Sequence, residues 1–231
     1  MNKRMVVKMV SMVCGLLIVS VAAAVSLADL SNQDASGGLK EALEKGSSAA
    51  IAKLGVTNGF FNNDQVKITL PGILEQAKPI LKLTGHGHQL DDLVASMNHA
   101  AESAVPMAKP LLINAVKSMS VTDAKNILSG GDTAVTSFFK EKTAGALAIK
   151  FLPIVKSITD RSGLSGQYNT TVAQVGKLGL VPKEQATVES YVTQKALDGL
   201  YYMIGEEEKA IRRDPIGYGG GLIGKVFGSL H

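Results

Sequence analysis

The stretch "LDDLVASMNHAAESAVPMAKPLL", Leu90 to Leu112, decides the fold class, because its apolar residues recur every three or four positions. This spacing places them on one face of a helix. The stripe consists of Leu90, Leu93, Val94, Met97, Ala101, Ala104, Val105, Ala108 and Leu111. Pro106 and Pro110 interrupt the pattern, since proline lacks the N–H that a helix interior needs. We therefore expect two helices, or one bent helix, between Leu90 and Met119.

The same periodicity extends over the rest of the chain. Further helices are predicted at 31–55, 71–83 and 120–130, from 132 through "GALAIKFLPIVKSITD", around 172–178 after a glycine-containing linker at 162–166, and at 183–213. Only Val66 to Leu70 resembles an extended segment. The prediction is an all-α fold, a single compact helical bundle or orthogonal helical array, with at most one short extended segment near residues 66–70.

The N-terminus has the order of a signal peptide. Lys3, Arg4 and Lys8 precede an uncharged stretch, Met9 to Ala28, which ends in the small-x-small triplet Ser26-Leu27-Ala28. We interpret residues 1–28 as a signal peptide and expect an exported, periplasmic protein. The alternative is an uncleaved segment that anchors the chain in the inner membrane, since the uncharged stretch is long enough to span a bilayer.

Loss of residues 1–28 would change the chemistry of the chain. The only cysteine, Cys14, would leave, and three of the 24 basic residues would leave while all 20 acidic residues stay. The remaining chain would be almost neutral, with no basic stripe interleaved with aromatic residues. We therefore expect no disulfide, no thiol chemistry and no nucleic-acid partner.

The helical domain is expected over residues 29–215, followed by a glycine-rich tail at 216–231. Gly219, Gly224 and Lys225 have the spacing of a phosphate-binding P-loop. However, no strand precedes them, and Val226 stands where the motif needs a hydroxyl. We expect no cofactor, and interpret Gly217–Gly221 as a mobile tether. Its apolar tip would dock on the bundle or engage a membrane or partner, through Leu222, Ile223, Val226 and Phe227.

A polar motif lies beside the apolar stripe of Leu90–Leu112. Asn98 and Glu102 are four residues apart, so they share one side of the helix. The favoured interpretation is that they bind loop backbone and fix the fold, and the alternative is a polar patch in a ligand groove. His99 and Glu102 are three apart, a spacing compatible with acid–base or metal chemistry. Di-iron bundles use the reverse order and repeat it on a second helix, which this sequence does not do.

Two other groups of polar residues have less specific patterns. His86 and His88 are weak candidates for a metal site with Asp91 or Asp92, and are expected to be solvated because no fourth ligand is identifiable. The run 206–213, "EEEKAIRR", is expected to form a solvated helix face with a Glu208–Arg212 pair.

Several segments together carry a family resemblance: "GLKEAL" (38–43), "GFFNNDQVKITLP" (59–71), "SMNHAAESAVPMAKPL" (96–111), "MSVTDAKNILSGGDTAVTSFF" (119–139) and "YVTQKALDGLYYMIGEEEKAIRRDP" (191–215). In this order they resemble the bacterial family catalogued as domain of unknown function 4197. The resemblance implies an exported helical protein and supplies no catalytic residues. Where that family usually reads Asn-Arg-Ala-Ala-Glu, this chain has His99, so a role that needs a permanent cation there is in doubt.

These observations favour a non-enzymatic envelope protein. We expect it to bind an apolar small molecule, a lipid or a protein partner in a groove between helices, with peripheral membrane contact as a further option. The alternative is a metal-dependent or acid–base hydrolase that uses His99 and Glu102.

Overall fold

A computed structural model of the chain describes residues 32–161, 163–176 and 186–229. The protein is all-α, and the described residues contain no strand. The helices are α1 (Asn32–Leu54), α2 (Gly72–Leu83), α3 (Gly87–Ala104), the 3-10 turn η2 (Val105–Ala108), α4 (Lys109–Lys117), α5 (Val121–Ser129), α6 (Ala134–Thr159), α7 (Gly163–Gly176), α8 (Val188–Arg213), α9 (Pro215–Tyr218) and α10 (Gly221–Gly228).

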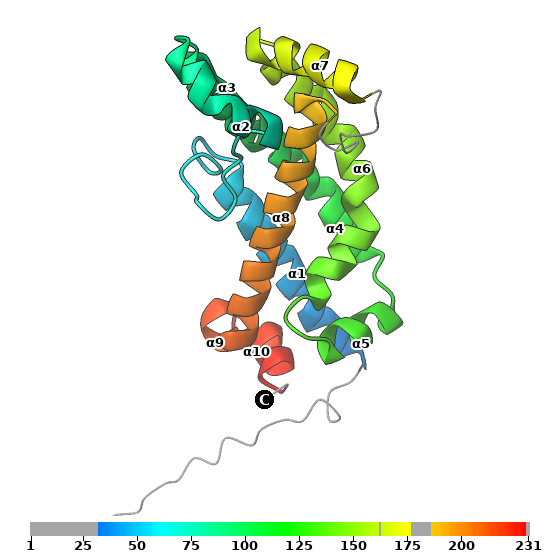
Figure 1. Ribbon diagram of the computed structural model, residues 1–231. Coiled ribbons are helices and arrows are strands. Elements are labelled where there is room, and N and C mark those ends of the chain that lie inside the picture. The colour runs from blue at the N-terminus through cyan, green and yellow to red at the C-terminus, as the bar shows by residue number, and fades with distance from the viewer. Residues whose placement is uncertain (1–31, 162, 177–185, 230–231) are drawn as a thin grey trace, which may run out of the picture.

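Helix α8 lies at the centre of an elongated bundle and extends along much of its length (Figure 1). It packs against α6, α1 and α3, and α3 also packs against α6. The fully buried core side chains of these helices include Leu39, Leu93, Phe139, Phe151 and Leu200. The four long helices thus share one core, and burial of each such side chain stabilises the folded state by about 1.5–3 kcal/mol.

The proline-containing stretch divides into two helices, one of the two outcomes that its sequence predicts. Helix α3 ends at Ala104, the 3-10 turn η2 contains Pro106, and α4 begins at Lys109 with Pro110 in its first turn. Proline is tolerated in a first turn, where its missing N–H would have no helical partner. The α-helix is therefore interrupted here without leaving the core, since Val105 and Ala108 are fully buried.

The segment expected to be extended, residues 66–70, forms no strand: Val66 lies in a turn and residues 67–70 have no regular secondary structure. Val66, Ile68 and Leu70 are buried, while Thr69 is exposed and Lys67 is half-buried. This alternation is that of a β-strand with one buried face. Two side chains take the place of a neighbouring strand: Asn98, which is described below, and Tyr191, whose hydroxyl donates to the Thr69 carbonyl at 3.1 Å.

The C-terminal residues fold back onto the bundle. Asp214 ends α8 and caps α9 by accepting a hydrogen bond from the Gly217 N–H, and Gly220 and Gly221 turn the chain with φ of 56° and 49°. Helix α10 then packs on α1. The residues expected to form a mobile tether are therefore helix and turn, because capping and the positive-φ glycines give the backbone a defined path.

The four predicted tail anchors lie on α10. Ile223, Val226 and Phe227 are buried and Leu222 is part exposed. The approach of α10 to α1 is close at Gly38, where a Cβ atom would lie 2.6 Å from Val226 Cγ2 and 2.7 Å from the Leu222 carbonyl oxygen. Gly38, which the sequence indicates only as a weak helix residue, thus creates the space in which the tail docks.

Some predicted boundaries were wrong. Helix α7 already begins at Gly163, so most of the glycine-containing stretch expected as a linker is helical. Helix α8 begins at Val188 rather than near residue 183, because Thr187 is extended and its side chain accepts a hydrogen bond from the Ser190 N–H. The predicted signal segment 1–28 lies outside the described residues, and so does the stretch 177–185. Within the part of the chain that the structure describes, no helix is long and apolar enough to span a membrane.

Candidate functional site

Asn98 lies on α3 and binds the extended segment as a neighbouring strand would. Its Oδ1 accepts a hydrogen bond from the Ile68 N–H at 2.8 Å, and its Nδ2 donates to the Ile68 carbonyl at 2.8 Å. Nδ2 also donates to the Val94 carbonyl at 2.8 Å. The side chain is fully buried, so these bonds satisfy polar groups that have no access to water.

Glu102, one turn further along α3, holds the turn at residues 58–61. Its Oε1 accepts from the N–H groups of Phe60 and Phe61 at 3.0 and 3.1 Å, and its Oε2 accepts from Asn58 N–H at 3.0 Å. Asn58 has a φ of 65°, the left-handed conformation that asparagine adopts more readily than most residues. The buried carboxylate therefore supplies hydrogen-bond acceptors for N–H groups that this irregular backbone would otherwise leave unsatisfied.

His99 connects this structural motif to the surface. Its Nδ1 lies 2.8 Å from Glu102 Oε2, and its ring stacks on Phe61 with the ring centroids 6.0 Å apart. The Lys67 ammonium covers Phe61 at 4.3 Å from the ring centroid. The side chain of His99 remains 45% exposed. Its orientation is thus set by a carboxylate and an aromatic ring, while an edge of the imidazole faces solvent.

The exposed part of His99 lines a groove of about 410 Å³ between α3 and the corner where α6 meets α7. One wall is α3, and the other combines the end of α6 with the start of α7. The polar residues of the groove are Gln89, Asp92, Ser96, His99, Arg161 and Gln167. Its volume is in the range of small-molecule sites. Six of its eight lining residues are polar or charged, which differs from the apolar groove expected from the sequence.

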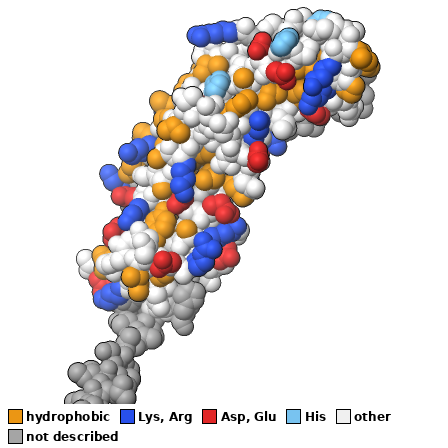
Figure 2. All heavy atoms as spheres, turned by 90° about the vertical axis from the view of Figure 1, so that its left-hand side faces the viewer, with side chains coloured by type: hydrophobic (Ala, Val, Ile, Leu, Met, Phe, Trp, Pro, Cys, Tyr) orange, Lys and Arg blue, Asp and Glu red, His pale blue; other side chains and the backbone are white. Residues whose placement is uncertain are grey.

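A second groove, of about 540 Å³, lies between α2, α3 and the extended segment. It is lined by Phe61, Lys67, Lys78 and Asp91 among others. The stacked Phe61–His99 pair connects the two grooves, because each ring lines one of them. Figure 2 shows the side of the molecule on which α2 and α3 lie, and there charged side chains of both signs alternate with scattered hydrophobic ones. This face is therefore suited to polar contacts.

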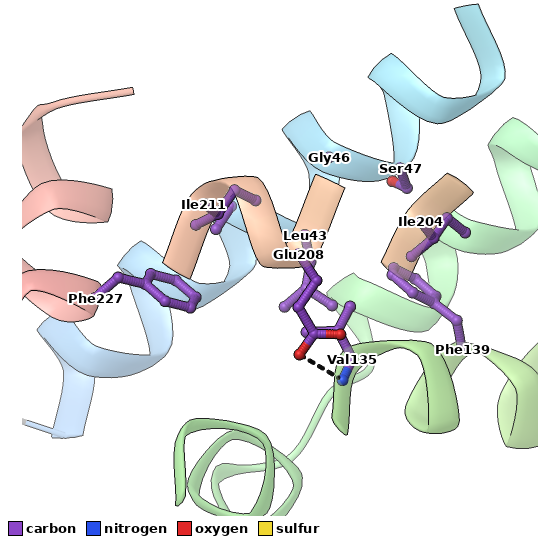
Figure 3. A pocket seen from close by; sticks show the side chains of 10 residues that line it. Leu43, Gly46, Ser47, Val135, Phe139, Ile204, Glu208, Ile211 and Phe227 are labelled. Atoms are coloured by element: carbon purple, nitrogen blue, oxygen red, sulfur yellow. Dashed lines mark hydrogen bonds between the residues drawn. The ribbon is translucent and has the colours of Figure 1, made fainter. Parts of the chain in front are cut away.

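An apolar void lies elsewhere, between α1, α6, α8 and α10 (Figure 3). Leu43, Phe139, Ile211 and Phe227 line it, and its volume of about 10 Å³ is room for about one water molecule. Its polar side chains are those of Ser47 and Glu208. It is therefore a packing defect beneath the C-terminal helix rather than a ligand cavity beside Asn98.

The expectation of a solvated face at residues 206–213 was wrong for Glu207 and Glu208. The side chain of Glu208 is 1% exposed and that of Arg212 is 13% exposed. Glu208 accepts hydrogen bonds from the N–H groups of Val135 and Thr136 at the start of α6. Arg212 binds Glu208 and donates to the Ile127 carbonyl. The pair thus joins the end of α5 to the start of α6, because each helix terminus leaves backbone groups unsatisfied.

Glu207 binds side chains of α1 and α9 instead. It forms an ion pair with Lys53 of α1 and accepts a hydrogen bond from the Tyr218 hydroxyl at 2.6 Å. Burial, followed by the hydrogen bond to Glu207, raises the pKa of Tyr218. Burial is also the main cause that raises the pKa of Glu208, against the opposing effect of its hydrogen bonds. These two adjacent glutamates therefore fix α1, α6 and α9 around α8.

The other predicted residues are His86, His88 and those of the P-loop-like stretch. His86 precedes α3, and its Nδ1 lies 3.1 Å from the Thr84 hydroxyl, while His88 is exposed. Across the described ranges, no three His, Cys, Asp or Glu side chains come together as a metal site requires. Lys225 of the P-loop-like stretch lies 3.4 Å from Asp34, and Val226 is buried. This stretch contains no strand, so its geometry is not that of a P-loop.

The fold and the site define a class of protein: an all-helical bundle in which a central polar motif holds an irregular loop and its histidine opens into a polar groove. The chain belongs to the family described as Protein of unknown function (DUF4197), whose model matches residues 29–228. The resemblance noted in the sequence is thereby confirmed. No curated protein and no solved structure matches the chain.

Proposed function

We propose that this protein is an exported, non-enzymatic binding protein whose ligand lies in the groove between α3 and the α6–α7 corner. The observation that carries the proposal is the position of His99. Its ring is oriented by Glu102 and Phe61, yet its free edge lines a groove of about 410 Å³. Binding sites commonly hold a few polar groups rigidly while leaving them open to the ligand.

The proposed ligand differs from the one expected from the sequence. The sequence favours an apolar small molecule, a lipid or a protein partner, whereas the groove beside His99 presents carboxylate, guanidinium, amide and hydroxyl groups. A ligand must satisfy such groups when it displaces water from them. We therefore propose a polar small molecule as the first choice. Export is part of the proposal and is supported by the basic, apolar and small-residue order of residues 1–28.

The test is to purify the full chain natively, in the form in which the cell exports it, and to identify released small molecules by mass spectrometry. Ser96 lies in the wall of the groove, so Ser96→Trp fills part of the space and is expected to abolish ligand retention. The matched control is Ser129→Trp, at an exposed position at the end of α5. Equal retention by the Ser96 variant and the unaltered chain would refute the groove as the binding site.

A hydrolase remains the second candidate, and the His99–Glu102 pair is the observation that favours it. A carboxylate 2.8 Å from His99 Nδ1 orients the imidazole as a general base requires. Ester and amide hydrolysis by the native protein should then disappear in His99→Ala. This candidate is rejected if the native protein shows no hydrolysis, or if His99→Ala hydrolyses the substrate as fast as the native protein does.

Export is tested separately. N-terminal sequencing of the purified protein shows whether residues 1–28 have been removed.

A further inference from the structure

The two walls of the groove beside His99 carry complementary hydrogen-bonding groups. On the α3 wall stand the Asp92 carboxylate, which only accepts hydrogen bonds when ionised, and His99. On the opposite wall stands Arg161, whose guanidinium only donates. The groove therefore has an accepting side and a donating side.

The available nitrogen of His99 belongs to the accepting side. Glu102 already accepts hydrogen bonds from the N–H groups of Asn58, Phe60 and Phe61, and an ionised carboxylate has no proton to donate. The His99 nitrogen that lies 2.8 Å from Glu102, Nδ1, must therefore carry a proton. In a neutral imidazole the other nitrogen, Nε2, then has a lone pair. In that form His99 presents an acceptor on the same α3 wall as Asp92, two helical turns further along.

The two charges of the groove have no partner within the described parts of the chain. Asp92 and Arg161 form no ion pair there, although the residue next to Arg161, Asp160, is paired with Lys156. Both Asp92 and Arg161 are exposed. A ligand can therefore bind these two charges without breaking an existing ion pair of the protein.

We infer that the ligand of this groove is a small zwitterion of the amino-acid class, with one carboxylate and one ammonium group. The inference rests on the proposed function and specifies its ligand. The carboxylate is bound by Arg161, whose planar fork matches it. The ammonium group donates to the Asp92 carboxylate, and His99 Nε2 is a further acceptor on the same wall. The amides of Gln89 and Gln167 and the Ser96 hydroxyl are left for the side chain of the ligand.

Isothermal titration calorimetry tests the inference with the twenty standard amino acids and their C-terminal amides as probes, added to the full chain as the cell exports it. At least one amino acid is expected to bind, and its amide more weakly. Arg161→Gln should weaken binding of that amino acid about tenfold or more, as expected for loss of a charge-assisted hydrogen bond, and weaken binding of the amide much less. Asp92→Asn should weaken binding of both.

Two exposed residues that do not line the groove supply matched controls. Arg213→Gln and Asp64→Asn remove the same charges elsewhere and should leave all affinities unchanged. Circular dichroism of each variant verifies that it is folded. If Arg161→Gln binds the amino acid as tightly as the unaltered chain does, the inference is overturned.

The outcomes separate this inference from the proposed function. If no amino acid binds, but Ser96→Trp releases another small molecule retained by the unaltered chain, the groove is a binding site and the zwitterion is wrong. If no amino acid binds and Ser96→Trp changes nothing, both the function and its ligand class are rejected.

Discussion

Single polar side chains of α3 and α8 determine how irregular backbone is held in this protein. Asn98 satisfies both backbone groups of Ile68, and Glu102 satisfies three N–H groups of the 58–61 turn. Glu208 does the same for the start of α6. Each side chain is buried, so its removal leaves backbone groups without a partner and without water.

Asn98→Ala tests this role at the level of one residue. The substitution removes both hydrogen bonds to Ile68, and we expect the free energy of unfolding to fall by about 2–4 kcal/mol, since buried unsatisfied groups cost about 1–3 kcal/mol each. Urea denaturation followed by circular dichroism measures the loss. The control, Asn62→Ala, changes an exposed side chain and should have an effect within about 0.5 kcal/mol. Similar values for both variants would contradict the role assigned to Asn98.

Glu208 gives a prediction about pH. Burial raises its pKa in the folded protein above the ordinary value of 4.5, so the folded state binds the proton more tightly than the unfolded state does. Its contribution to stability is therefore present below pH 4.5 and is lost as pH rises through the raised pKa. In Glu208→Gln this decline is absent. The stability of the unaltered chain relative to the variant should thus be greater at pH 4.5 than at pH 7, in thermal unfolding at both pH values; a constant difference would contradict the raised pKa.

At the scale of elements, the contact between α1 and α10 depends on a glycine. We expect Gly38→Ala to lower the free energy of unfolding by about 1–3 kcal/mol, because the new Cβ would clash with the α10 backbone at Leu222 and with Val226. Hydrogen exchange should also become faster in residues 215–228. The neighbouring substitution Gly37→Ala meets its nearest atom at 3.9 Å and should stabilise α1 by about 0.5–1 kcal/mol. Equal effects of the two substitutions would show that α10 does not dock at Gly38.

The helix boundaries also show how much of the structure can be predicted from neighbouring residues. The break between α3 and α4 at Pro106 and Pro110 and the capping box of Ser120 and Asp123 at α5 follow from residues a few positions apart. The start of α6 does not. Thr133 occupies its N-cap without a side-chain hydrogen bond, and the amides of Val135 and Thr136 are bound by Glu208 from α8. A cap supplied from a distant helix leaves no local signal.

At the scale of the whole molecule, α8 contacts helices from both halves of the chain. It packs against α1, α3, α6 and α9, so none of these can separate without exposing core surface of another. We therefore expect one unfolding transition in urea, with coincident midpoints for helical circular dichroism and tyrosine fluorescence. Two separated transitions in the full chain would indicate independently folding parts and contradict the single shared core.

The sequence alone predicted most features of the fold. The helical class, the division of the central stretch into two helices and the family all follow from spacing and motifs within short windows. About the candidate site it predicted less. It indicated Asn98, His99 and Glu102, but gave no sign of Arg161, which enters the groove from the end of α6.

The sequence by itself determined the helices, because an α-helix depends on neighbours three and four residues away and on its own capping residues. Only the tertiary structure decided which charges are buried, where the C-terminal helix docks and which side chains share a groove. Glu208 illustrates the physical reason. Whether it is solvated or buried depends on Val135, 73 residues distant in the chain, and no local pattern records that contact.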